Sequence, residues 1–214
     1  MFRRRTALSV SVTAALLAAT PLLAACGSDA HPGAAAVVEG KRITVSQLQA
    51  RVKQVRDAQA KSPQGGQLIM NTGRLSLATL NAMIFDEVLA RSAEDAGVTI
   101  TRSDIQKWRA QAEKRAGGAA RLQAMWLQQG VAPHEVDGVV RNQLLLDGLA
   151  THIGADRGQP QGQQRLADAL SKTSRSMGID VNPRYGKWDD KQVILGETKY
   201  PWITHDAGAG RQPV

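Results

Sequence analysis

Hydrophobic residues recur three and four positions apart along most of the chain after residue 45, which is the spacing of one helix face. Leu80, Ile84 and Val88 illustrate this in the strongest segment, where we expect Ser76 to cap the helix and Gly97 to end it. The predicted helices cover residues 46–60, 77–96, 102–116, a short stretch around 122–126, 133–153 and 163–176.

Short strands are predicted only near the two ends of this helical region. Residues 37–43 indicate a strand, a glycine-containing turn and a second strand, and residues 179–182 and 192–195 indicate two further strands. Residues 62–66 and 154–162 are predicted loops. Aromatic residues make up only 4% of the chain, whereas alanine and leucine are frequent, and this composition favours helix over sheet. We therefore predict a mainly α fold.

The first 26 residues have the layout of a secretory signal. Three arginines at residues 3–5 precede an apolar stretch over residues 7–19, and small residues follow at 24–25. The sequence Leu23-Ala24-Ala25-Cys26 resembles the lipobox of bacterial lipoproteins, in which the cysteine carries the lipid. Cys26 is the single cysteine of the chain, so no disulfide explains it. We predict a signal peptide over 1–25, lipidation of Cys26 and a tether over 26–36.

This prediction changes how the basic charge is interpreted. The formal charge of +8 falls to +5 when residues 1–25 and their three arginines are removed. A basic chain inside the cell would suggest nucleic acid, but an exported chain does not. The remaining charge fits residence near an anionic membrane or wall polymer, or solubility alone, which we favour. We predict an extracytoplasmic protein attached to the cell membrane by its N-terminal lipid, on the outer leaflet of the cytoplasmic membrane if the source is Gram-positive.

Residues that could carry catalysis or bind a metal are scarce. The four histidines, at positions 31, 134, 152 and 205, form no helical metal-binding pair, and no phosphate loop or nucleophile elbow occurs. His134–Glu135 and Asp86–Glu87 are adjacent pairs on predicted helices, where neighbours point in different directions, so we interpret them as solvated surface. We predict no catalytic residue, no metal and no cofactor.

Several segments together resemble the SurA- and PrsA-type extracytoplasmic chaperones. Residues 37–44 resemble the opening strand and turn of that family, and residues 93–101 resemble the end of a family helix. Residues 140–145 and 181–188 resemble a later helix and the returning strand. The resemblance implies a SurA-N-like helical domain over 37–203, closed by pairing of an N-terminal with a C-terminal strand, and a flexible tail over 204–214.

The same resemblance limits the expected activity. Larger members carry a parvulin prolyl isomerase module between the long helix and the returning strand, whereas here only residues 154–178 fill that interval, without paired histidines. We therefore expect no enzyme, but a chaperone-like holdase that binds unfolded or exported polypeptides. A scaffolding lipoprotein with one dedicated partner and a divergent prolyl isomerase are the alternatives.

Four apolar residues are candidates for a peptide groove, because methionine and tryptophan suit adaptable apolar binding. These are Trp108, Met125, Trp126 and Leu127. The alternative interpretation of the four residues is ordinary core packing at helical spacing.

Overall fold

The computed structural model describes residues 32–196, and this part of the chain is mainly α, as predicted. The predicted signal peptide, Cys26 and the tail over 204–214 lie outside the described residues. Seven α-helices form the described part: α1 (Val45–Ala60), α2 (Gly65–Asn71), α3 (Leu75–Asp95), α4 (Arg102–Ala116), α5 (Ala119–Gln128), α6 (Val136–His152) and α7 (Pro160–Ser176). No helix among residues 32–196 has the length and apolar character needed to cross a membrane.

The strands form two small antiparallel sheets. One has the order β2-β1-β3 and the other pairs β4 with β5. Their bounds are β1 (Ala34–Val38), β2 (Lys41–Thr44), β3 (Asp180–Val181), β4 (Lys187–Asp189) and β5 (Ile194–Gly196). Ala36 pairs with Val181, which confirms the predicted closure of the domain by an N-terminal and a C-terminal strand.

The first strand begins inside the segment that was predicted to be a tether. β1 starts at Ala34, and Ala34, Ala35 and Ala36 are fully buried. An alanine run has low strand propensity, so it resembles a linker in the sequence. The segment forms a strand here because Ala35 and Ala36 are buried in the main hydrophobic core.

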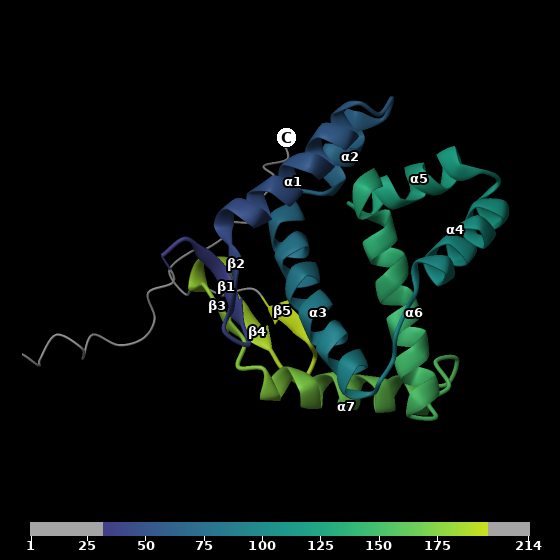
Figure 1. Cartoon of the computed structure of the whole chain (residues 1–214). Helices are drawn as coiled ribbons and strands as arrows, with labels where there is room; N and C mark the ends of the chain where they lie inside the picture. The colour runs from purple at the N-terminus through teal and green to yellow at the C-terminus, as the bar shows by residue number, and fades with distance from the viewer. Residues whose placement is uncertain (1–31, 197–214) are drawn as a thin grey trace, which may run out of the picture. The chain divides into compact units, whose positions relative to one another are not determined.

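The core is built around α3. Leu80, Ile84, Val88 and Leu89 of this helix are fully buried, as the helical spacing predicted. Figure 1 shows α3 in the middle of the fold, with the strands on one side, α6 on the other and α7 crossing one end. α6 contributes buried side chains such as Leu149 to the same core.

Helix ends follow local chemistry in some places and not in others. The Asp104 amide donates to the Thr101 side chain, and the Thr101 amide donates to the Asp104 side chain, so these two residues form a capping box at the start of α4. Gly117 ends α4 with a φ of +80°. The predicted cap of α3 at Ser76 is wrong, because the helix begins at Leu75 and its N-cap residue, Arg74, makes no side-chain cap bond.

Helix α2 occupies part of the predicted loop over 62–66. Gly65 begins the helix where a Cβ atom would lie 2.5 Å from the Gln59 carbonyl oxygen, so glycine allows the close return of the chain onto α1. Arg56 of α1 then donates hydrogen bonds of 2.6 Å to both the hydroxyl and the carbonyl oxygen of Thr72. Adjacent glycines look like a loop in sequence, but this tertiary contact makes them the start of a helix.

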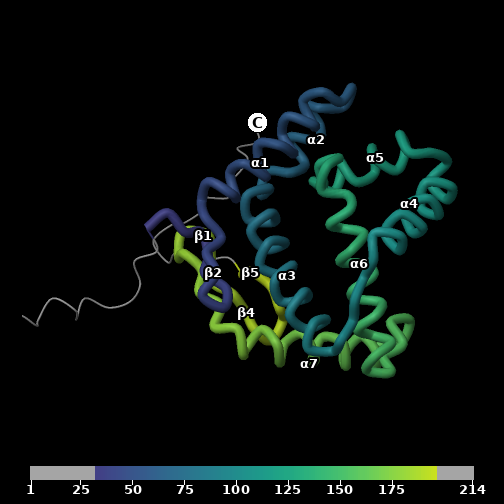
Figure 2. The backbone as a smooth tube through the Cα atoms, viewed as in Figure 1, coloured from purple at the N-terminus to yellow at the C-terminus, as the bar shows by residue number. Residues whose placement is uncertain are grey.

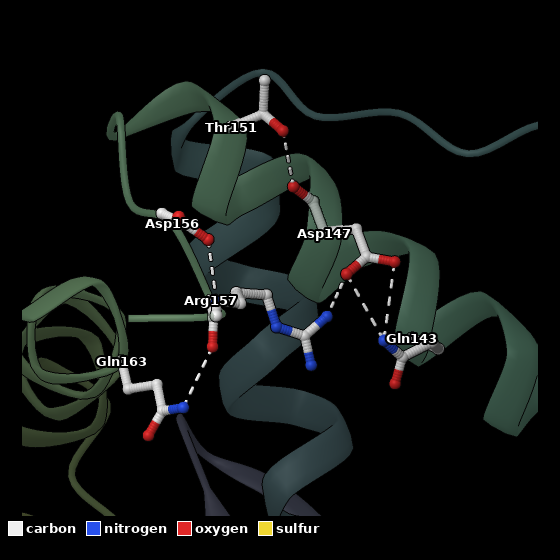
Figure 3. A network of polar contacts seen from close by, with 7 residues as sticks. Gln143, Asp147, Thr151, Asp156, Arg157 and Gln163 are labelled. Atoms are coloured by element: carbon white, nitrogen blue, oxygen red, sulfur yellow. Dashed lines mark hydrogen bonds and ion pairs between the residues drawn. The ribbon is translucent and has the colours of Figure 1, made fainter. Parts of the chain in front are cut away.

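The loop between α6 and α7 is held by a polar network (Figure 3). Asp147 accepts hydrogen bonds from Arg157 and from Gln143 on the preceding turn of α6. Gln163 of α7 donates to the Arg157 carbonyl oxygen at 2.9 Å. The network links the end of α6, the loop and the first turn of α7, which begins at Pro160 rather than at the predicted residue 163.

Two glycines of α6 have different surroundings. A Cβ atom on Gly148 would lie 2.6 Å from Cγ1 of Val98, in the segment after α3, whereas one on Gly138 would meet nothing within 4 Å. The close approach of Val98, a loop residue, therefore explains why residue 148 is glycine. No close approach of another atom explains the glycine at 138.

Candidate functional site

Three adjoining hollows surround one face of α1. The first, of about 370 Å³, lies between α1, α3 and α6, and the second, of about 410 Å³, lies between β2, α1 and α3. The third, of about 570 Å³, separates the second half of α1 from α5. Arg51 and Asp86 line both of the first two hollows, and His134 lines the first and the third. The three hollows therefore form one connected surface.

Helix α1 supplies a continuous wall of this surface. Its lining residues are spaced three and four apart, as on one helix face, and the C-cap residue Lys61 continues the row: Gln47, Ala50, Arg51, Gln54, Asp57 and Ala58. From Gln47 to Lys61 the wall is about 21 Å long, at 1.5 Å per helical residue. That length matches about six residues of extended polypeptide.

The centre of the surface is charged. Asp86 of α3 accepts a 2.5 Å hydrogen bond from the Asn142 side-chain amide of α6. Arg51 lies between two carboxylates, with its Nη1 3.6 Å from Asp86 and its Nε 3.5 Å from Glu135. Burial raises the pKa of the Asp86 carboxyl above its ordinary value, although Arg51 and Asn142 act in the opposite direction. Three helices and the turn before α6 thus meet at one ionic cluster.

Apolar side chains line the hollows on either side of this cluster. In the first hollow, Val139 of α6 is 37% exposed and faces a wall of small residues, Ala78 and Ala82, on α3. In the third, Leu127 and Ala124 of α5 lie opposite Ala58 of α1. Small residues leave room for a ligand side chain, so the surface can accept alternating polar and apolar groups.

The sequence did not reveal this cluster. Asp86 and Glu135 were each interpreted as half of an adjacent, solvated pair. The structure corrects that interpretation for both residues, because the fold brings the two carboxylates to Arg51 although they lie on separate elements. The available signal was weak: Asp86 continues the helical spacing of Ala78 and Ala82 on α3. The position of α6 cannot be obtained from that spacing.

The four predicted groove residues lie in different surroundings. The indole rings of Trp108 and Trp126 stack at 6.4 Å with 13° between their planes, so they pack α4 against α5. Leu127 is buried and lines the third hollow. Met125 is 51% exposed and is not among the residues that line the three hollows.

Helix α2 carries two exposed apolar side chains that the sequence did not lead us to expect. Met70 of α2 is 76% exposed, and Ile69 beside it is 39% exposed. Figure 2 shows α2 at the far end of α1 from β1 and β2. Because no helix was predicted between residues 60 and 77, no helix face was expected to carry these residues. Among residues 32–196, no group of three histidine, cysteine, aspartate or glutamate side chains is arranged to hold a metal ion.

Comparison with known proteins gives one match. Residues 1–114 match the family described as SurA-like N-terminal domain, and this segment is more than half of the 214-residue chain. It ends within α4, so α1 and α3 of the described surface lie inside the match and α5 to α7 follow it. No curated protein and no solved structure matches the chain. On this match, the chain belongs to the SurA-like N-terminal domain family.

Proposed function

We propose that this protein is a lipid-anchored, extracytoplasmic chaperone-like protein that binds unfolded or exported polypeptides along α1. The observation that carries the proposal is the connected surface of three hollows, in a chain of the SurA-like N-terminal domain family. Membership of that family favours a chaperone-type activity, and the surface has the length and chemistry of an extended peptide site.

The mixed lining supports a site that tolerates many sequences. Small apolar residues in the first and third hollows favour client side chains by burial, without a deep pocket that would select one shape. Charges of both signs occur on the wall, because Asp57 and Lys61 accompany Arg51. A site with this mixture holds a chain weakly at several points, as a holdase requires.

A pair of matched substitutions tests the surface. Ala82 and Ala90 are both exposed residues of α3, but only Ala82 lines the first hollow. Ala82→Trp fills the hollow and is expected to weaken binding of an unfolded client peptide by roughly tenfold, the effect of losing about 1.4 kcal/mol. Ala90→Trp adds the same bulk outside the hollows and is expected to bind as the original protein does.

The measurement is fluorescence anisotropy with a labelled unfolded peptide, together with suppression of aggregation of a reduced, unfolded client. Failure of the unaltered protein in both assays would exclude the holdase. Equal loss with Ala82→Trp and Ala90→Trp would exclude this surface as the binding site and leave the activity to be located elsewhere.

The anchor at Cys26 is supported by the signal-like residues 1–25 and the lipobox-like sequence that ends at this cysteine. Two acyl chains on one residue suffice for stable membrane attachment. Growth with a radioactive fatty acid is expected to label the protein, and Cys26→Ser is expected to lose the label. Retention of the label by Cys26→Ser would exclude the anchor.

We propose no catalytic activity. In place of an isomerase module, the interval between α6 and β3 holds the single helix α7. A protease-coupled tetrapeptide assay is the test, and a rate above the uncatalysed background would establish the divergent isomerase instead. Crosslinking in intact membranes separates a holdase, which captures many proteins, from a scaffold with one partner.

A further inference from the structure

The described fold begins at one end of the three-stranded sheet, and several hydrogen bonds fix its first residues there. The Gly33 carbonyl oxygen accepts a 2.9 Å bond from the amide of Val45, the first residue of α1. The Ala34 carbonyl oxygen accepts a 3.2 Å bond from the Asn182 side-chain amide, and the Asn182 backbone amide donates to Ala35 at 3.0 Å. The start of β1, the start of α1 and the turn after β3 therefore lie together.

Only a short length of chain separates this end of the sheet from the lipid. Cys26 precedes Gly33 by seven residues, which span at most about 25 Å when fully extended. The inference drawn from this distance rests on the lipid anchor of the proposed function. With that anchor, the Gly33 end of the domain stays within the same distance of the bilayer surface.

The surface at this end suits a lipid headgroup layer. Pro183 and Arg184 are exposed, and the Arg184 guanidinium lies 5.2 Å from the centre of the Tyr185 ring. An aromatic ring with a cation above it combines an apolar body with a charge that can bind phosphate. Lys187 on β4 is a second exposed cation nearby in sequence, and the carboxylates on either side are Asp180 on β3 and Asp189 at the end of β4.

We infer that the turn over Asn182–Tyr185 and the start of α1 lie on the anionic membrane surface, with Arg184 binding lipid phosphate. The 16 residues of α1 then carry the third hollow and α2 about 24 Å farther out, at 1.5 Å per residue. The three hollows follow α1 away from the bilayer. A client leaving the membrane would meet the second hollow, next to β2, before the third.

Depth-sensitive fluorescence tests the orientation. The full lipidated protein is reconstituted in vesicles of phosphatidylethanolamine and phosphatidylglycerol, with a polarity-sensitive dye attached through Ser46→Cys or, separately, Met70→Cys. Both positions are exposed, Ser46 at the start of α1 and Met70 on α2. Nitroxide groups on the lipid headgroups are expected to quench the dye at position 46 at least twofold more than at position 70. Equal or stronger quenching at 70 would overturn the inference.

A charge reversal tests the role of Arg184. In the Ser46→Cys protein, Arg184→Glu is expected to reduce quenching to the level seen in vesicles without phosphatidylglycerol. Lys172→Glu, on the exposed side of α7, makes the same charge change elsewhere and is expected to leave quenching unchanged. An unchanged signal with Arg184→Glu would remove Arg184 from the contact. If the unaltered protein fails to float with vesicles, the anchor itself is absent, which distinguishes failure of the proposed function from failure of the orientation.

Discussion

The α3–α6–α7 core and the arm formed by α4 and α5 are held together in different ways. α3 alone places Leu80, Ile84, Val88 and Leu89 at full burial. In the arm, α4 buries only Ala112, and α5 buries Leu122 and Leu127. The core is therefore stabilised by a continuous apolar cluster, whereas the arm depends on a few contacts. Regions with few buried apolar contacts open at lower free energy than the core.

Polar contacts do little to compensate for this difference. Arg109 of α4 donates a 2.7 Å hydrogen bond to Asp137 of α6, but the two side chains are 40% and 63% exposed. Exposed ion pairs contribute between zero and about 1 kcal/mol. The arm is thus free to adjust its position without loss of the core, and it forms one side of the third hollow. If the proposed client binding moves any part of the domain, we expect the movement in the arm.

The largest expected effect contrasts two leucines. Leu149→Ala removes a buried side chain from the core and is expected to lower the free energy of unfolding by about 2–5 kcal/mol. Leu127→Ala in the arm is expected to cost roughly 1–2 kcal/mol, because the arm can close around the loss. Urea denaturation followed by circular dichroism measures both. Equal losses would show that the arm and the core form one cooperative unit.

Two glycines of α6 sharpen the comparison within a single helix. Gly148→Ala places a Cβ atom 2.6 Å from Val98 and is expected to destabilise the protein by about 1–3 kcal/mol. Gly138→Ala meets no atom within 4 Å and is expected to stabilise it by up to about 1 kcal/mol, from helix propensity. Thermal denaturation of the two variants should therefore give opposite signs, and destabilisation by both would contradict the difference in packing.

Trp126→Ala removes the stack with Trp108 that packs α5 on α4. An aromatic pair contributes about 0.5–1.5 kcal/mol beyond area burial, so a loss near 1 kcal/mol is expected. Hydrogen exchange should accelerate in α4 and α5 and stay unchanged in α3 and α7. Acceleration spread over all four helices would mean that the stack supports the core as well.

The smallest effect concerns pH. Burial raises the pKa of Asp86 in the folded protein above its ordinary value of 3.8, so ionisation disfavours the folded state. The contribution of Asp86 to stability is complete below 3.8 and is lost as the pH rises through the raised folded value. Asp86→Asn should therefore gain stability relative to the original protein across that window.

Urea titrations at several pH values between about 4 and 7 measure this difference. Asp168→Asn, which removes an exposed carboxylate on α7, is the control. A constant difference between Asp86→Asn and the original protein at every pH would contradict the shift in the Asp86 pKa.

Much of the helical framework could be predicted from local sequence. The spacing of Leu80, Ile84 and Val88 located α3, and α4 begins at the predicted residue 102, because such signals act within a few residues. The sequence predicted a loop at Gly65 and a tether at Ala34, whereas the structure has the start of α2 and the start of β1 there. Ala34 is held by Asn182, far away in sequence, and Gly65 lies close to Gln59, six residues before it. Local propensity carries no information about either contact.

The surface around α1 was less predictable than the fold. Arg51, Asp86 and Glu135 belong to three separate elements, and each looks like an ordinary surface charge in its own segment. Their meeting depends on how α3 and α6 pack. Trp108 and Trp126 show the converse, because residue types typical of binding sites are used here to pack two helices together.

The sheet that joins β1 to β3 has a consequence for how the protein reaches its folded state. Ala36 pairs with Val181, so β1 forms its contact with β3 only after nearly the whole described chain is available, whereas its other neighbour, β2, follows it directly in sequence. Pairing over such a separation is slow, because the loop must close before the contact stabilises it. As the chain emerges from its N-terminus, β1 would have only β2 as a strand partner until β3 follows α7. Closure of the domain by β3 would then be its last step, and until that step one edge of β1 stays open to pairing with other strands.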